Sequence, residues 1–200
     1  MDKSVLITGG TGFFGRSFVS YVRERGLPYR ISVMSRGKAP VDSFFDGVDV
    51  IRGDVLDFRL DRKFDFIIHA ATPVQARVSD DELESVTVDG TKNVLRFALE
   101  SGCRKLLYTS SGAVYGKFDA PRAEGDPCEP DTRYGQAKLK AEKLCLESGV
   151  DVAIARCYAL SGRYLNKNIQ YAIGNFVRDA VAGRDIVVRS DGNSVRSYLD

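Results

Sequence analysis

Near the N-terminus, the sequence reads Val5-Leu6-Ile7-Thr8-Gly9-Gly10-Thr11-Gly12-Phe13-Phe14-Gly15, an apolar run followed by closely spaced glycines. The apolar run predicts a buried strand, and the apolar spacing over residues 13–25 predicts a helix. Gly9, Gly12 and Gly15 therefore lie in a strand-to-helix turn with the spacing GxxGxxG. Small residues let such a turn approach a pyrophosphate, which the free N–H groups and positive end of the helix attract. This position predicts a dinucleotide-binding turn, although a glycine triplet by itself is explained equally well by a flexible turn.

The rest of the chain alternates between short β-branched runs and longer segments with apolar residues at helical spacing. This alternation predicts an α/β fold: a Rossmann-type doubly wound parallel sheet whose helices form right-handed crossovers. The expected strands cover residues 4–8, 29–34, 48–52, 64–69, 105–109 and 150–155, and the expected helices cover 13–25, 81–100 and 131–148. A further helix is expected at 169–181 and a further strand at 186–189.

We expect two regions along the chain. Residues 1–160 form the dinucleotide-binding domain, and residues 161–200 begin a small substrate-binding region. The sequence stops at Arg196-Ser197-Tyr198-Leu199-Asp200, which reads as the start of another element. We therefore expect the second region to be truncated.

Basic and acidic residues nearly balance, with 29 Lys and Arg against 27 Asp and Glu, and they are interspersed. This pattern gives no basic stripe suited to nucleic acid or to a membrane surface, and it predicts a small-molecule partner. The N-terminal apolar run is too short for a signal peptide or a membrane span, so a cytoplasmic protein is expected. The four cysteines have no CxxC spacing and the sequence has a single histidine, so neither a metal site nor a disulfide framework is predicted.

The predicted second strand ends at Ser35-Arg36, about twenty residues after the glycine turn, where an enzyme for NAD normally carries an acidic residue. A hydroxyl and a guanidinium suit the 2′-phosphate of NADP, because guanidinium pairs with phosphate and no carboxylate repels it. We expect NADP to be preferred over NAD; the alternative is that Arg36 is a solvated surface residue. Asp54 and Val55 follow the third strand at the edge where adenine is expected, although Asp54 is equally compatible with a turn or a helix cap.

Tyr134 and Lys138 are four residues apart in a predicted helix, so both side chains lie on one face. A tyrosine that exchanges protons near neutral pH needs positive charge nearby, since its phenol otherwise has a pKa of about 10. By itself, the Tyr-xxx-Lys spacing usually marks a solvated helix face. The hydroxyl cluster Thr109-Ser110-Ser111 ends the predicted fifth strand, at the sheet edge where ligands of open α/β sheets bind. This context favours a catalytic role for Tyr134 and Lys138.

Four motifs occur in order: the glycine turn, His69-Ala70-Ala71, Thr109-Ser110-Ser111-Gly112-Ala113-Val114-Tyr115-Gly116 and Tyr134-xxx-Lys138. In this order they resemble the NAD(P)-dependent epimerase/dehydratase family of extended short-chain dehydrogenases, over essentially the whole chain. The resemblance implies that Ser111 hydrogen-bonds the reacting sugar oxygen, Tyr134 is the acid/base, and Lys138 binds the nicotinamide ribose and tunes Tyr134. The cofactor-binding residues expected in total are Gly9, Gly12, Phe13, Phe14, Gly15, Ser35, Arg36, Asp54, Val55, Ala70, Ala71, Thr109, Tyr134 and Lys138.

Two adjacent positions depart from the pattern of one branch of the family. Members that are 4,6-dehydratases carry an Asp-Glu pair directly after the catalytic hydroxyl, where this chain has Gly112 and Ala113. Neither residue can transfer a proton, so the ordinary dehydratase mechanism is disfavoured. Arg196 resembles the arginine that holds the nucleotide diphosphate of the substrate, and a strand-edge surface arginine explains it equally well.

The resemblance implies a nucleotide-sugar epimerase or 4-ketoreductase of cell-surface polysaccharide synthesis, acting by hydride transfer on a nucleotide-diphosphate sugar. A homodimer is expected through the helices at 81–100 and 131–148. Two alternatives are a non-catalytic dinucleotide-binding sensor or scaffold on the same fold and a reductase of a non-nucleotide carbonyl compound. His69 is expected to have a packing role, since the family places it beside the cofactor's pyrophosphate with no acid/base role.

Overall fold

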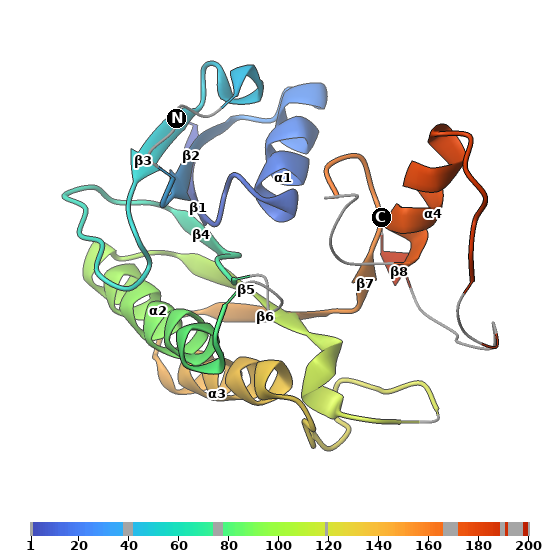
Figure 1. Ribbon diagram of the computed structural model, residues 1–200. Coiled ribbons are helices and arrows are strands. Elements are labelled where there is room, and N and C mark those ends of the chain that lie inside the picture. Colours follow the sequence, from blue (N-terminus) through green and yellow to red (C-terminus); the bar gives the residue numbers. More distant parts are fainter. Residues whose placement is uncertain are drawn as a thin grey trace. The chain divides into compact units, whose positions relative to one another are not determined.

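The computed structural model describes residues 2–37, 42–73, 78–118, 120–165, 172–188, 191 and 198–199. The chain divides into two units, residues 1–156 and 157–200 (Figure 1). The strands of the main sheet are β1 Lys3–Thr8, β2 Tyr29–Ser35, β3 Asp49–Arg52, β4 Phe66–His69, β5 Lys105–Ser111 and β6 Val152–Cys157. The helices of the first unit are α1 Phe13–Glu24, α2 Asp80–Ser101 and α3 Arg133–Glu147, with 3-10 turns η1 Ser43–Phe45 and η3 Gly112–Tyr115.

The sheet has the strand order β3-β2-β1-β4-β5-β6. The pairings of β1 with β2 and β4, of β2 with β3 and of β4 with β5 are all parallel. The order runs outward in two directions from the β1–β4 pair, as in a doubly wound fold. The α/β class and the Rossmann-type sheet expected from the sequence are therefore confirmed.

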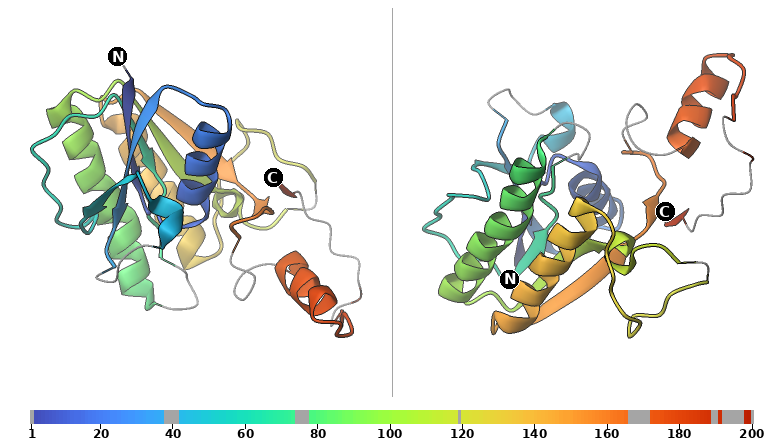
Figure 2. Two further views of the ribbon diagram at one scale, coloured as in Figure 1. Left: turned by 90° about the horizontal axis from the view of Figure 1, so that it is seen from above. Right: turned by 60° about the horizontal axis from the view of Figure 1, so that its bottom comes forward.

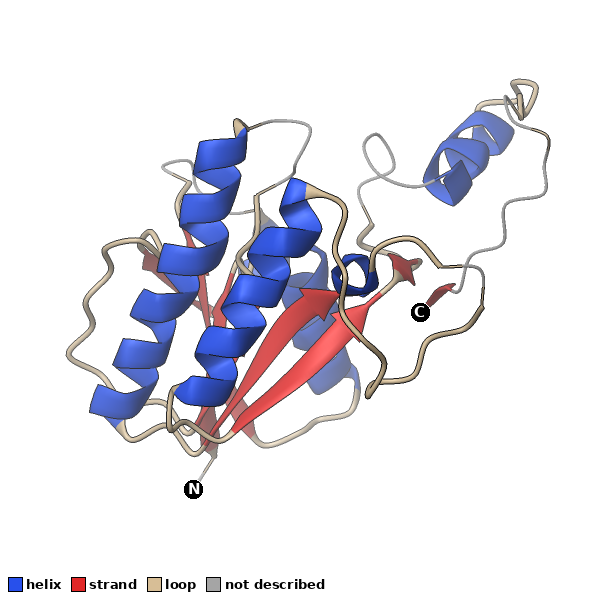
Figure 3. Ribbon diagram, turned by 90° about the horizontal axis from the view of Figure 1, so that it is seen from below, coloured by secondary structure: helices blue, strands red, loops and turns tan. Residues whose placement is uncertain are grey.

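Helices cover both faces of this sheet, and alternate strand residues pack against each layer. In β1, Leu6 packs in the core on the side of α2 and α3, whereas Val5 and Ile7 pack with Val19 of α1 on the other side. This alternation follows from the two-residue period of a strand. Figure 2 shows α1 on one side of the sheet and the pair α2 and α3 on the other, and Figure 3 shows these two helices side by side.

Side-chain caps determine where the two long helices begin. The Ser79 hydroxyl accepts a hydrogen bond from the Glu82 amide at 3.2 Å, and α2 starts at the next residue after this cap. The Thr132 hydroxyl accepts one from the Gly135 amide at 3.0 Å, so α3 begins at Arg133, two residues later than position 131 expected from the sequence. Such caps satisfy amides that have no partner within the helix.

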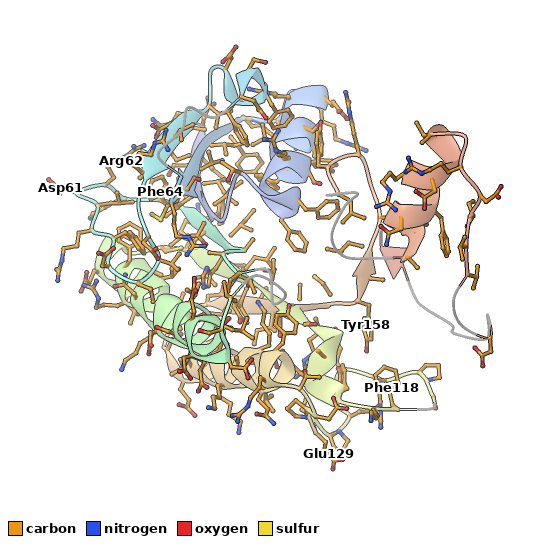
Figure 4. All side chains as sticks on the ribbon, viewed as in Figure 1. Asp61, Arg62, Phe64, Phe118, Glu129 and Tyr158 are labelled. Carbon is orange, nitrogen blue, oxygen red and sulfur yellow. The ribbon has the colours of Figure 1, made fainter. Side chains whose placement is uncertain are left out.

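The loop between β3 and β4 packs against α2. Phe64 is 3% exposed and lies 6.3 Å from the ring of Phe97 on α2. The guanidinium of Arg62 lies 5.3 Å from the centre of the Phe64 ring and pairs with Asp49 of β3 at 2.7 Å (Figure 4). These contacts hold the loop against α2 and against the amino end of β3.

The second unit contains β7 Ala159–Leu160, α4 Ala172–Val181 and β8 Tyr198–Leu199, and β7 pairs with β8 in parallel. Of the helix expected at 169–181, residues 172–181 are helical, and 169–171 lie outside the described residues. The strand expected at 186–189 is wrong for 186–188, which have irregular backbone; position 189 also lies outside the described residues. Ile186, Val187 and Val188 are 50–64% exposed, and β-branched residues favour a strand only where neighbouring strands cover them.

A hydrogen-bonded cluster around His69 joins β1, β4 and α2 inside the first unit. His69 is 1% exposed; its Nδ1 lies 2.7 Å from the Thr8 hydroxyl and its Nε2 lies 3.0 Å from the Thr91 hydroxyl. The Thr91 hydroxyl donates its own hydrogen to the Thr87 carbonyl at 2.5 Å, so it accepts from His69. His69 therefore carries its proton on Nε2, and Nδ1 accepts from Thr8. Burial, with a smaller effect from the Lys138 charge, lowers the pKa of His69 to about 3.

This depressed pKa predicts a pH-dependent stability. At a pH below the ordinary histidine pKa of 6.5, His69 binds a proton in the unfolded chain but stays neutral in the native protein. Its contribution to the free energy of unfolding is therefore complete above pH 6.5 and is lost as the pH falls toward 3. The dependence is about 1.4 kcal/mol per pH unit. Between pH 7.5 and pH 5, the free energy of unfolding should fall by about 2 kcal/mol more in the wild type than in His69→Gln. Urea denaturation at several pH values measures this difference, in which the carboxyl groups common to both proteins cancel; parallel pH profiles would contradict it.

Candidate functional site

The residues expected to bind the cofactor gather at the carboxyl edge of the main sheet. The glycine turn follows β1, Ser35 ends β2, and Ala70 follows β4. Because these strands are parallel, their carboxyl ends meet at one edge, and β1 and β4 are the neighbours between which the strand order reverses. In open α/β sheets, a crevice at this reversal is the usual ligand site. The topology thus brings together the ends of β1 and β4, where Thr8 and His69 are 61 positions apart in the sequence.

The turn between β1 and α1 is built for close approach of backbone to a ligand. Gly9 has a φ of 66°, and a Cβ there would lie 2.7 Å from the Ala70 carbonyl oxygen. At Gly15, a Cβ would overlap the Gly10 carbonyl group. Gly12 is the N-cap residue of α1 and has no side chain to bond the first amides of the helix. The result is a cradle of backbone N–H groups at a helix N-terminus, which fits the pyrophosphate of a dinucleotide.

A second part of the edge fits the adenosine end of a dinucleotide. The Ser35 hydroxyl lies 3.3 Å from the Thr11 hydroxyl, which ties the end of β2 to the glycine turn. Arg36 Nη1 lies 3.9 Å from Asp54 Oδ2, and both side chains are partly exposed. The expectation that no carboxylate opposes a phosphate here is therefore wrong in one respect: position 35 has none, but Asp54 reaches Arg36 from the neighbouring strand end. Asp54 lies beside Arg36 because β3 is the neighbour of β2 in the sheet, and the spacing of residues in the sequence does not predict this neighbour.

Two residues of α2 that the sequence analysis did not assign support this adenosine edge. Asn93 Nδ2 donates to the Val55 carbonyl at 2.8 Å. A Cβ at Gly90 would lie 2.7 Å from a Val55 methyl carbon, so the helix packs directly on this residue. An amide side chain among the apolar positions of α2 is the signal that could have identified Asn93, because a half-buried amide needs hydrogen-bond partners.

Lys138 is the most buried charge of the site, with 1% of the residue exposed. Its ammonium donates to the Thr72 hydroxyl and to the Thr109 carbonyl, each at 2.8 Å, and lies 4.8 Å from the centre of the Tyr108 ring. These partners offset the cost of removing the ammonium from water, since hydrogen bonds to a charge contribute roughly 1.5–3 kcal/mol each. Thr72 had no sequence signal of its own; it follows the Ala70-Ala71 pair and meets Lys138 only in the fold.

Tyr134 lies one helical turn before Lys138, on the same face of α3. The Lys138 ammonium is 5.9 Å from the centre of the Tyr134 ring. Tyr134 is partly exposed whereas Lys138 is buried. A fixed positive charge at this distance favours the phenolate form of a tyrosine, because the attraction is stronger in a partly desolvated site than in water. The pair can therefore accept and return a proton.

Ser111 ends β5 and caps the 3-10 turn η3. Its hydroxyl oxygen accepts a hydrogen bond from the Ala113 amide at 3.2 Å, so its own hydrogen can be donated to another acceptor. The first turn of α3 packs closely on η3: a Cβ at Gly135 would overlap the Ala113 carbonyl oxygen. The glycine next to Tyr134 thus lets the helix lie against the segment that follows Ser111. Thr109, on the same strand, donates its hydroxyl to the His69 carbonyl at 3.1 Å.

Other expected features were a substrate arginine and the absence of a metal. Arg196 lies outside the described residues. Among the residues that the structure describes, no group of three or more His, Cys, Asp or Glu side chains could hold a metal ion, and the four cysteines are free. None of the described helices has the length and apolar character needed to cross a membrane.

Comparison with known proteins identifies relatives of this chain. Residues 5–200 match the model of the NAD dependent epimerase/dehydratase family. UDP-N-acetyl-alpha-D-glucosaminuronate decarboxylase of Bacillus cytotoxicus is 31% identical over 99% of this chain and 67% of its own length, and UDP-glucose 4-epimerase of Halalkalibacterium halodurans is 27% identical over 98% and 66%. The chain spans about half to two thirds of the length of the curated relatives it matches.

Solved structures agree with the sequence relatives. A UDP-galactose 4-epimerase structure superimposes with a TM-score of 0.78 at 26% identity, covering 98% of this chain and 67% of that one. The dTDP-glucose 4,6-dehydratase of Bacillus anthracis, solved with NAD, has a TM-score of 0.84 at 22% identity over 98% and 67%, a likeness of fold. On the extent of the family match and of these similarities, the chain belongs to the NAD dependent epimerase/dehydratase family.

Proposed function

We propose that the protein transfers hydride between a nicotinamide dinucleotide and a carbon of a nucleotide-diphosphate sugar, as an epimerase or a 4-ketoreductase. The observation that carries this proposal is the buried Lys138 ammonium, held by Thr72 and Thr109 at 5.9 Å from the Tyr134 ring. Burying a lysine ammonium costs free energy that its hydrogen bonds only offset, so its place beside a partly exposed tyrosine favours a role in the chemistry of the site.

The side chains divide the work as follows. Tyr134 takes the proton from the sugar hydroxyl while the carbon bearing that hydroxyl loses hydride and becomes a carbonyl. Lys138 stabilises the phenolate of Tyr134 before the proton arrives and binds the ribose next to the nicotinamide. Ser111 donates its hydrogen to the reacting sugar oxygen and orients it. A bound nicotinamide dinucleotide would supply the hydride acceptor and donor: the oxidised form for an epimerase, and the reduced form for a 4-ketoreductase, in which Tyr134 gives its proton to the new hydroxyl.

The dinucleotide fits the backbone cradle of the site. A Cβ on Gly9 or Gly15 would collide with the backbone of Ala70 or Gly10, so the glycines let the turn pack tightly at the N-terminus of α1, whose first amides suit a pyrophosphate. The backbone of Ala70 and Ala71 lies directly against Gly9 of the turn. Asp54 and Val55 would line the adenine side, and Phe13 and Phe14 begin the helix whose N-terminus faces the phosphates.

Dehydration is not proposed, even though relatives include a dTDP-glucose 4,6-dehydratase. Elimination of water needs one group that removes a proton from the sugar and another that protonates the leaving hydroxyl. Gly112 and Ala113 follow Ser111 directly and carry no such groups. An epimerase or ketoreductase needs only the proton transfer that Tyr134 provides.

A second candidate is decarboxylation of a nucleotide-activated uronic acid, which the 31% identity to a glucosaminuronate decarboxylase favours. Oxidation of the carbon next to the one that bears the carboxylate produces a β-keto acid. Such an acid releases carbon dioxide without the acid and base that Gly112 and Ala113 lack. Product analysis with UDP-glucuronic acid distinguishes the two: release of carbon dioxide supports this candidate, and an epimerised uronic acid supports the first.

The roles above predict the effect of Tyr134→Phe. Removal of the phenol oxygen eliminates proton transfer but leaves the helix and Lys138 in place, so kcat should fall by about 10²–10⁴-fold. The dinucleotide Kd, measured by calorimetry, should remain that of the wild type. Tyr21→Phe on α1, where Tyr21 is 49% exposed, is the matched control and should keep full turnover.

Three results would count against the proposed function. Unchanged turnover in Tyr134→Phe would remove Tyr134 from the reaction. Dinucleotide binding by the wild type without turnover of any nucleotide sugar or simple carbonyl compound would favour the sensor alternative, since the fold alone does not determine function. Turnover of a simple carbonyl compound and not of a nucleotide sugar would favour the reductase alternative.

We further propose that the edge formed by Ser35 and Arg36 favours NADP over NAD. The guanidinium can pair with a 2′-phosphate, and the Ser35 hydroxyl next to it accepts or donates without charge repulsion. Asp54 opposes this preference, because its carboxylate lies 3.9 Å from the same guanidinium and would repel a phosphate there. The preference for NADP over NAD therefore depends on the difference between the attraction of the 2′-phosphate to Arg36 and its repulsion by Asp54.

This balance predicts opposite shifts in two variants. Arg36→Asp should weaken NADP binding by about 10–100-fold, the value of one lost charge-assisted interaction, with little change for NAD. Asp54→Asn should strengthen NADP binding and leave NAD binding nearly unchanged. Calorimetric titration of each variant with both dinucleotides measures the four constants; a wild type that binds NAD more tightly than NADP would overturn the preference.

We also propose a homodimer that pairs through α2 and α3. These helices lie side by side on one face of the sheet, and each carries an exposed leucine: Leu99 is 54% exposed and Leu146 is 75% exposed. Exposed apolar side chains on helices are frequent at interfaces between copies of a chain.

The variant Leu146→Glu should shift the sedimentation of the protein from dimer to monomer, because burying an unpaired carboxylate is unfavourable. Leu56→Glu, outside both helices and 41% exposed, is the matched control. A wild type that sediments as a monomer at all concentrations would contradict the dimer.

A further inference from the structure

A second buried charge lies on α3, one helical turn beyond Lys138. Glu142 is 2% exposed, and with Tyr134 and Lys138 it occupies every fourth position on one face of the helix. The Arg156 guanidinium, from β6, donates to both of its carboxylate oxygens: Nε at 3.1 and 3.2 Å and Nη2 at 2.8 Å. The Ser110 hydroxyl donates to Glu142 Oε1 in a short hydrogen bond. The roles proposed above for the site do not use Glu142.

Arg156 extends this arrangement to the loop after β5. Its Nη1 donates to the Tyr115 hydroxyl at 2.7 Å and to the Glu124 carbonyl at 3.0 Å, and the guanidinium lies 4.9 Å from the centre of the Tyr115 ring. The hydrogen bonds to Glu142 and Tyr115 raise the pKa of Arg156 above its usual value, although burial opposes this. One ion pair thus ties together α3, the end of β5, η3 and the loop that follows it.

Two adjacent residues of β5 link Glu142 to the reacting sugar oxygen: Ser110 bonds Glu142, and Ser111 is proposed to bond the sugar oxygen. Leu106 and Tyr108 pack in the core on the side of α2 and α3, so Ser110 lies on the same face of the strand. Ser111, the next residue, lies on the opposite face. A shift of the Ser110 hydroxyl toward or away from Glu142 would therefore move the Ser111 hydroxyl, because the two residues share one peptide unit.

We infer that Glu142 is a positioning residue that sets the place of the Ser111 hydroxyl relative to Tyr134. This inference rests on the proposed function and deepens it. A buried ion pair contributes little net stability compared with apolar side chains of the same size, so a role in geometry explains its presence better than a role in stability. Tyr134 and Glu142 belong to one rigid helix, and Ser110 and Ser111 belong to one strand end. The Glu142–Ser110 hydrogen bond joins these two bodies on the face of β5 opposite to Ser111.

The test is a double-mutant cycle with turnover as the readout. Glu142→Gln keeps the size of the side chain and removes the charge, and it should lower kcat by about 10–100-fold, the effect of a misplaced reacting group. The dinucleotide Kd should be unchanged. In a Ser111→Ala background, the same substitution should lower the remaining kcat by less than about threefold, because the group that Glu142 positions is already absent.

Two further variants keep the inference open to refutation if Glu142→Gln folds poorly. Ser110→Ala leaves the Glu142–Arg156 ion pair intact and removes only the link to β5; it should lower kcat in the same way by a smaller factor, again only when Ser111 is present. Glu84→Gln is the matched control. It neutralises another carboxylate that pairs with a residue of α3, Lys140, but on the surface, and it should leave kcat unchanged.

The outcomes separate this inference from the proposed function. Equal fold losses with and without Ser111 would show a general structural role for Glu142 and would overturn the inference, as would wild-type kcat in a folded Ser110→Ala protein. If Ser111→Ala and Tyr134→Phe themselves retain full turnover, the proposed function fails instead. Circular dichroism and the urea midpoint of each variant verify that the proteins compared are folded.

Discussion

The buried ammonium of Lys138 is the charge on which the arrangement of the site depends. A lysine with 1% exposure is tolerated only because the Thr72 hydroxyl, the Thr109 carbonyl and the Tyr108 ring surround it. These partners come from three places: the segment after β4, the end of β5 and the middle of β5. The requirement to stabilise one charge inside the protein therefore holds α3 against β5 and the segment after β4, and it sets the distance from that charge to the Tyr134 ring.

The second constraint is the lack of side-chain volume at the crossing points of the backbone. The turn after β1 packs against the segment after β4 at Gly9, and α3 packs against η3 at Gly135. Both contacts bring backbone within the distance that a Cβ would occupy. At the turn after β1, this close packing of the backbone suits the binding of an anion. At the contact between α3 and η3, it brings Tyr134 toward the end of β5. Packing and ligand binding thus place the same demand on these positions.

Charges at the site are paired in two different ways. The buried carboxylate of Glu142 and the partly exposed Arg156 form a bidentate pair that links α3 and β6 with the end of β5, η3 and the loop after it, whereas Arg36 and Asp54 face each other at 3.9 Å on the exposed edge. The buried pair has few alternative arrangements, so it suits a positioning role. The exposed pair is screened by water and can separate, so it suits discrimination between two ligands that differ by one phosphate.

The sequence by itself determined the α/β class, the parallel sheet, the glycine turn and the family, because strand and helix periodicity, glycine spacing and the order of four motifs are local properties of the chain. It could not predict the partners of the buried charges. Thr72 is far in sequence from Lys138, Asn93 from Val55, and Ser110 from Glu142, and only the tertiary fold brings each pair together. The expected strand at 186–188 was wrong for the same reason, since β-branched residues need a neighbouring strand that no local pattern supplies. The tertiary structure alone decided which polar groups meet, because burial requires each one to find a partner wherever the chain returns to it.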